Sequence, residues 1–308
     1  MCHRSILAAA VLACLTGGRC EAGTYTWNNT GTDWGTASSW SPAGGPPDAS
    51  NSDLALFTPN GSSGTIVQDP NIAGNQSALS LTLFPNQLFG GWTIGGSGIL
   101  GVGGPGSTGL TASGPATYTF NGPTLQGNSS SSLLNFTLTN GSAVVLAGNS
   151  TASNNFSTLA INGGTFRLDN SVISMPRLAA TGTVAVSGGG SLELIGNSAA
   201  SVTENAGNLA TVTNSFSGVN TIKVSPNGQA TTLNFANSGS INLSPGSRAV
   251  IAFQATSGNL GDSNGARVTF GSGSPNLGAG GLLAVTNNSS SQQVGFAIVN
   301  DALGANWA

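Results

Sequence analysis

The sequence predicts an all-β protein, a single-stranded parallel β-helix (β-solenoid) with coils of about 20–25 residues and an N-terminal tryptophan-rich β cap. Glycine makes up 47 of the 308 residues, about twice its usual share, and charged residues only 6%. Apolar residues still account for 38% and alternate with polar ones, which indicates strands and excludes disorder. Glycine-containing turns separate these runs, and the chain from Gly23 onward lacks an amphipathic pattern of helical length.

The clearest unit of this pattern is a short segment, Leu159 to Leu168, built around a Gly-Gly turn. Leu159 and Ile161 share one face of the strand before the turn, and Phe166 and Leu168 share one face of the strand after it. Arg167 is on the opposite face. A chain that turns several corners and returns beside its own start would pair such strands in parallel, with the four apolar side chains in the interior and Arg167 exposed.

Similar turns recur through most of the chain. They fall at Gly95-Gly96, Asn121-Gly122, Asn140-Gly141, Gly163-Gly164, Gly188 to Gly190, Asn227-Gly228 and Pro245-Gly246. The gaps between them are uneven, and the longest, from Gly189 to Gly228, fits two units with a degenerate turn near Gly207. This spacing predicts the coil length and the stacked architecture.

Residues 1–22 are predicted to be a signal peptide that is removed on export. Arg4 precedes a short apolar run over residues 5–16, and Cys20 and Ala22 place small residues at a cleavage site. The run is too short to span a bilayer as a helix. Cleavage removes every cysteine and the single histidine, and leaves five basic and nine acidic residues, a net charge of −4. Nucleic acid is an unsuitable partner for such a chain, since phosphate binding needs clustered Lys and Arg.

The remaining chain divides at about residue 90. Residues 23–89 form a tryptophan-rich β segment that holds Trp27, Trp34 and Trp40, and residues 90–308 form the β-helix. A last strand is expected at 295–299. Few residues follow it, so we expect a chain truncated at the C-terminus whose open edge self-associates end to end.

Two stretches resemble a known family. Residues 161–171, Ile-Asn-Gly-Gly-Thr-Phe-Arg-Leu-Asp-Asn-Ser, resemble the repeat unit of bacterial autotransporter-associated β-strand repeat proteins. The segments at 25–27, 34, 39–42 and 53–57 resemble the tryptophan-rich entry segment of the same exported proteins. The resemblance implies a passenger-like β-helix and supplies no catalytic residues. We expect the protein to be exported and to be extracellular, at the cell surface or in the periplasm. The sequence departs from the family's pattern, because we expect neither a C-terminal membrane barrel nor an apolar sorting anchor within its 308 residues.

Motifs for chemistry are few. Catalysis by a Ser-His or Cys-His pair and binding of zinc are excluded in the mature chain, because histidine and cysteine are absent. The glycine pattern at 101–106 is not followed by a helix and therefore predicts a turn, not a dinucleotide site. The glycine run at 95–98 lacks the Asp of calcium-binding repeats. We therefore expect no cofactor and no metal.

Two sets of residues remain as candidate sites. Asp169 and Glu193 lie one unit apart and could form an acid pair of the kind that glycosidases use, although outward acids on a solenoid are more often solvated. Trp27, Trp34 and Trp40 could stack against sugar rings, or they could pack the open end of the solenoid. Trp92 is expected in the core of the first coil.

Two functions follow from these observations. The first is an exported structural or adhesive surface protein without catalytic activity, whose partner is a cell-surface glycan or protein. The alternative is a carbohydrate-binding or carbohydrate-active β-helix protein, a lyase or a hydrolase. A cluster of acids beside a base on one face would favour the alternative, and the acids are scattered along this sequence.

Overall fold

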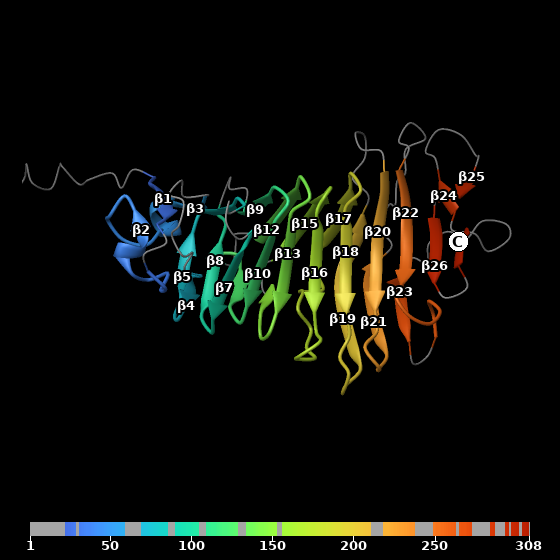
Figure 1. Ribbon diagram of the computed structural model, residues 1–308. Coiled ribbons are helices and arrows are strands. Elements are labelled where there is room, and N and C mark those ends of the chain that lie inside the picture. Colours follow the sequence, from blue (N-terminus) through green and yellow to red (C-terminus); the bar gives the residue numbers. More distant parts are fainter. Residues whose placement is uncertain are drawn as a thin grey trace, which may run out of the picture.

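The computed structural model confirms a parallel β-solenoid, a rod of stacked strands that runs from β1 at one end to the C-terminal strands at the other (Figure 1). It describes residues 22–28, 31–58, 69–85, 90–104, 109–128, 134–152, 156–210, 218–237, 249–262, 265–272, 284–286, 293–295, 297–301 and 304–307. The predicted signal peptide lies outside these residues except for Ala22.

Three sheets, which we call A, B and C, form the sides of the rod. Sheet A contains, in spatial order, β2 (Trp40–Ser41), β1 (Thr24–Trp27), β3 (Leu54–Phe57), β6 (Ser80–Leu83), β9 (Gly109–Ser113), β12 (Leu134–Thr139), β15 (Phe156–Asn162), β17 (Thr183–Ser187), β19 (Val202–Ala210), β21 (Thr231–Asn237) and β23 (Ala266–Ser272). Sheet B contains β4 (Asn71–Ile72), β7 (Trp92–Gly96), β10 (Thr117–Asn121), β13 (Ala143–Ala147), β16 (Thr165–Asp169), β18 (Ser191–Ile195), β20 (Gly218–Ser225), β22 (Ala249–Ala255), β26 (Ala297–Asp301) and β27 (Gly304–Trp307). Sheet C contains β5 (Gln76–Ala78), β8 (Ile99–Val102), β11 (Thr124–Gln126) and β14 (Thr151–Ala152). A separate pair is formed by β24 (Ala284–Thr286) and β25 (Gln293–Gly295), and two short 3-10 helices are η1 (Ala37–Ser39) and η2 (Ala49–Asn51).

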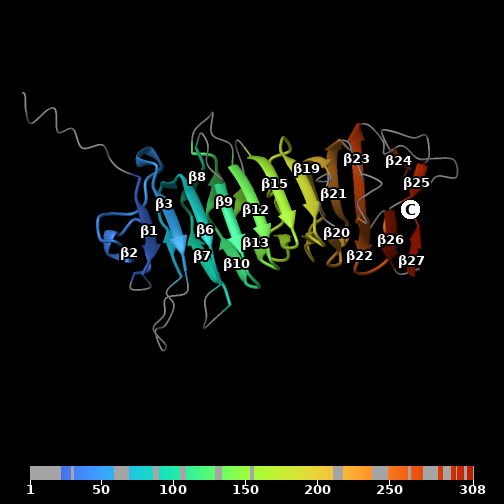
Figure 2. The same cartoon turned by 90° about the horizontal axis from the view of Figure 1, so that it is seen from above.

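Each early coil visits the three sheets in turn, as β12, β13 and β14 do. The next coil pairs with it in parallel: β15 lies beside β12, and β16 beside β13. Figure 2, seen from above, shows the strands of sheet A side by side along the rod. The alternation of the sequence thus becomes an inner apolar stack and an outer polar surface.

Several coils are longer than the turn spacing predicts. In sheet B, Arg167 lies opposite Glu193, which follows it by 26 residues along the chain. The next partner of Glu193 is Lys223, and these two are 30 residues apart. The coil therefore lengthens toward the C-terminus over these three strands.

The glycine turns gave too short a period because they belong to different corners. Gly163 lies between sheets A and B, whereas Gly122 follows sheet B on the way to sheet C. Both have positive φ, at 71° and 121°, a conformation that glycine adopts without a Cβ clash. Gly207, expected at a degenerate turn, lies inside β19. Its Cβ would lie 1.5 Å from the Gly182 carbonyl oxygen, so its glycine serves close packing of two coils.

The predicted register is confirmed at the central unit. Leu159, Ile161, Phe166 and Leu168 are fully buried. Arg167 points outward with 39% of its side chain exposed. The two strands of the unit do not form a hairpin, because they belong to different sheets and pair with neighbouring coils.

Parallel stacking begins earlier than the expected boundary at residue 90. In sheet A, β1 pairs with β3, β3 with β6 and β6 with β9, all in parallel. The tryptophan-rich segment therefore supplies the first coils of the solenoid as well as its end. The physical reason is that its strands already carry the same inward alternation, with Ala55 and Phe57 buried in β3.

The C-terminal edge of sheet B also differs from the expectation. An unpaired parallel edge was predicted after residues 295–299, but β27 folds back and pairs antiparallel with β26, placing Trp307 opposite Ile298. Sheet A ends, among the described strands, at β23. No helix within the described segments is both long and apolar enough to cross a bilayer.

Candidate functional site

The three tryptophans considered for sugar stacking are buried at the N-terminal end of the rod. Trp27 and Trp34 have no exposed surface and Trp40 has 1%. The Trp40 ring meets Trp27 and Trp34 edge-on, with ring centroids 5.2 and 4.8 Å apart. Phe57 lies 5.7 Å from Trp27 and 5.2 Å from Trp92, which is buried as predicted. The ring faces are covered by one another, so these residues do not form an exposed platform and instead pack the end of the core.

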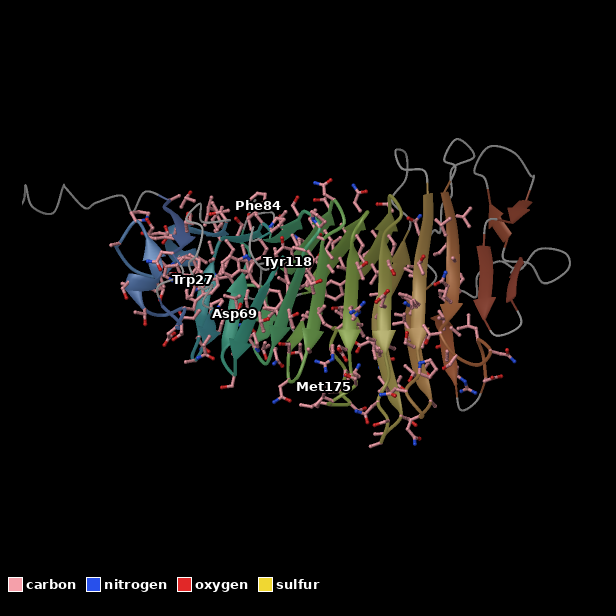
Figure 3. The ribbon with its side chains drawn as sticks, viewed as in Figure 1. Trp27, Asp69, Phe84, Tyr118 and Met175 are labelled. Atoms are coloured by element: carbon pink, nitrogen blue, oxygen red, sulfur yellow. The ribbon has the colours of Figure 1, made fainter. Side chains whose placement is uncertain are left out.

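A reversal of the chain direction produces this end. Strand β2 runs antiparallel to β1 and places Trp40 opposite Trp27. The indole Nε1 of Trp40 donates a 2.8 Å hydrogen bond to the Trp34 carbonyl oxygen. Figure 3 shows Trp27 at this end of the rod. Large rings cover the apolar stack that the first coil would otherwise expose.

The candidate acids Asp169 and Glu193 lie on neighbouring coils, in β16 and β18, but do not face each other. Glu193 is opposite Arg167, and Asp169 is opposite Ile195. Asp169 Oδ1 instead accepts a 3.0 Å hydrogen bond from the Ser171 backbone N–H and begins the corner after β16.

Glu193 belongs to a row of alternating charges on the outer face of sheet B. Its carboxylate lies 2.8 Å from Arg167 and 3.4 Å from Lys223, one on each neighbouring coil. The carboxylate lies between two cations, so the three side chains carry a net charge of +1 and link three coils. Partly exposed pairs of this kind contribute about 0–1 kcal/mol each.

A second polar cluster, inside the solenoid, was not predicted from the sequence. Arg177 is 1% exposed and Glu204 is fully buried. The guanidinium donates to the Ser150 carbonyl oxygen at 2.8 Å, to Asn170 Oδ1 at 3.1 Å and to the Ile173 carbonyl oxygen at 3.2 Å. We call these five residues the Arg177–Glu204 cluster.

Glu204 replaces a missing segment of backbone pairing. The side of the rod that sheet C forms continues beyond β14 through an isolated bridge between Ala152 and Leu178. On the next coil, β19 pairs with β17 only from Asn208 onward. The Glu204 carboxylate fills the interval by accepting the backbone N–H groups of Leu178 at 2.7 Å and Arg177 at 2.8 Å. From this coil on, one long strand such as β19 takes the place of two shorter strands such as β14 and β15.

Burial controls the electrostatics of this cluster. Loss of water raises the pKa of Glu204 to about 7, against the two N–H groups and the Arg177 charge, which favour the ionised form. Burial likewise lowers the pKa of Arg177, and the carboxylates of Glu204 and Asp169 oppose that change. The signal in the sequence was the alternation of Val202, Glu204 and Ala206, which places a carboxyl group on the inward face.

A groove, which we call the sheet B groove, crosses the outer face of the first coils. Its volume is about 710 Å³. Its described lining comes from the strands β7, β10 and β13, the corners before them, and Asp69: Asp69, Gly90, Gly91, Trp92, Thr93, Pro115, Ala116, Thr117, Thr119, Gly141 and Ala143. Asp69 Oδ1 accepts a 2.9 Å hydrogen bond from the Thr93 backbone N–H. Asp69 lies on the flank of the rod in Figure 3.

These features define the class of the protein as a parallel β-solenoid with an aromatic end, an outer charge row and a polar interior cluster. No protein-family model, curated protein or solved structure matches the chain. Among the described residues, no three His, Cys, Asp or Glu side chains group closely enough to hold a metal ion.

Proposed function

We propose that the chain is an exported structural or adhesive surface protein that acts as a rigid β-solenoid without catalytic activity. The observation that carries the proposal is the uninterrupted pairing of sheets A and B, of eleven and ten strands, along the rod. Such a rod holds its outer faces at a fixed distance from its ends. The resemblance of residues 161–171 and of the tryptophan-rich segment to autotransporter-associated repeat proteins supports the same proposal.

The state of the acids favours this function over a polysaccharide lyase or hydrolase. Glu193 is neutralised by Arg167 and Lys223, and Glu204 is enclosed in the core. A glycosidase needs two carboxyl groups that flank a substrate bond from an accessible cleft. Asp169 and Glu193 are offset along their strands and do not meet that need.

Export is tested by expressing residues 1–308, and a version that begins at Gly23, in a Gram-negative host. We expect residues 1–308 to reach the periplasm or the medium and the shortened version to remain inside. Retention of both inside the cell would contradict export.

Adhesion and the absence of catalysis are tested on the purified chain. Beads coated with it should adhere to bacterial or host cells more than beads coated with albumin. Incubation with a panel of plant and bacterial polysaccharides should release no reducing ends and no unsaturated sugars. Release of either product would make the protein an enzyme and overturn the proposal.

A further inference from the structure

We propose that the sheet B groove binds a neutral saccharide chain that lies along the solenoid axis. This inference rests on the adhesive function proposed above and names the class of ligand that the rod would contact.

Small residues line much of the groove. A Cβ on Gly91 would lie 1.7 Å from the Thr117 carbonyl oxygen, so this position admits only glycine. The neighbouring lining positions Gly90, Gly141 and Ala143 also carry little or no side chain. The volume of about 710 Å³ falls within the range of about 300–1,000 Å³ typical of small-molecule sites.

The floor presents hydroxyl groups on successive coils. Thr93 in β7 is opposite Thr119 in β10, and both face outward from sheet B. Thr117 is exposed beside them. A threonine hydroxyl can donate and accept at once, as a sugar hydroxyl does. Because coils repeat every ~4.8 Å, a chain along the axis would meet these hydroxyls on two successive coils, and the same row then continues with Val145, opposite Thr119 on the next coil.

Asp69 adds a fixed acceptor at one end of this row. Its Oδ1 is held by the Thr93 N–H at 2.9 Å, and its other oxygen can accept from a ligand hydroxyl in a charge-assisted bond. Pro115 is an exposed residue of the lining and offers an apolar surface to the C–H face of a sugar ring. Hydroxyls, one carboxylate and a small apolar surface are complementary to a saccharide.

Charge selects a neutral ligand. Asp69 is the one ionisable side chain among the described lining residues, and the whole chain carries a net charge of −3. A phosphate-bearing or uronate polymer would therefore be repelled. The cation Arg167 lies in β16, beyond the last strand of the lining, and its charge is shared with Glu193.

The test measures binding of the whole mature chain by isothermal titration calorimetry. The probes are cellohexaose, chitohexaose, maltohexaose and mannohexaose as neutral chains, with hexagalacturonate as the anionic chain. At least one neutral chain should bind, and hexagalacturonate should bind at least tenfold more weakly.

Three variants locate the site. Thr117→Trp fills the groove and should weaken binding at least tenfold. Thr221→Trp is the matched control, because Thr221 occupies the same outward row of sheet B through Ala143, Thr165 and Ser191 and lies four coils away; it should bind like the wild type. Asp69→Asn keeps the oxygen that accepts from Thr93 and removes the charge, so it should fold normally and bind several-fold more weakly.

Binding that is equal in the Thr117→Trp and Thr221→Trp variants would overturn the inference, as would tighter binding of hexagalacturonate than of every neutral chain. Absence of binding by all neutral chains would also overturn it. If coated beads still adhere to cells in that case, the adhesive function stands and only the groove assignment fails. Failure of export would count against the proposed function and leave the saccharide result to be judged separately.

Discussion

Glu204 should make the stability of the solenoid depend on pH near neutrality. The carboxyl is buried inside the rod and accepts the N–H groups of Arg177 and Leu178. In the unfolded chain it ionises with its ordinary pKa of 4.5, whereas in the folded chain burial raises the pKa to about 7.

The direction in which the free energy of unfolding changes with pH follows from proton binding. Between pH 4.5 and 7 the folded state keeps a proton that the unfolded state has released, so the free energy of unfolding falls as the pH rises. The stabilisation is complete below pH 4.5 and is lost as the pH passes through about 7. At about 1.4 kcal/mol per pKa unit, full ionisation costs about 3 kcal/mol.

Replacement of Glu204 by Gln removes the titrating carboxyl group and keeps the shape of the side chain. At pH 4 the Glu204→Gln variant should be about 1–3 kcal/mol less stable than the wild type, since its amide accepts one N–H and leaves the other unpaired. At pH 8 the difference should shrink by about 3 kcal/mol, because the wild type then carries the buried charge. The two stabilities should therefore approach each other, or cross, between pH 5 and 7.

The assay is urea unfolding at half-unit pH steps, with amide hydrogen exchange at Leu178 as a local readout, since repeat arrays can unfold in parts. Glu193→Gln is the matched control: it removes a carboxylate of the outer face and keeps Glu204, so the fall in stability that Glu204 produces should remain. A stability difference between wild type and Glu204→Gln that stays constant from pH 4 to 8 would refute the reasoning.

Three further outcomes are expected. Gly91→Ala should lower the melting temperature strongly, because its Cβ would lie 1.7 Å from a carbonyl oxygen, while Gly74→Ala, which meets nothing within 4 Å, should change it little; equal calorimetric melts would contradict this. Melting of residues 23–308 should be the same with and without dithiothreitol and EDTA, since this part contains no cysteine, and a drop of several degrees with EDTA would reveal a metal site. The purified chain should self-associate through β23, the last strand of sheet A among the described residues, and Thr269→Lys on the exposed face of this strand should reduce the association; a monomeric wild type in sedimentation at high micromolar concentration would rule it out.

Local pattern was sufficient for the architecture and for the inward residues of the central unit. Alternation has a period of two, so one buried face assigns every second side chain to the interior. Leu159 and Phe166 are buried and Arg167 is outward for this reason. The coil length was not predictable in the same way, because a glycine marks a corner without indicating which corner it is.

The sites depended on which residues the coils bring side by side. The pairing of Glu193 with Arg167 and Lys223 requires the register of three coils, which spacing along the chain does not determine. The sequence is compatible with Trp27 on an exposed platform or in the core, and the antiparallel pairing of β2 with β1 decides for the core. By itself, the sequence determined the alternation and the recurrence of turns, and hence the parallel solenoid. Only the tertiary structure decided that the carboxylate of Glu204 meets two backbone N–H groups of the preceding coil, because those partners lie 26 and 27 residues away.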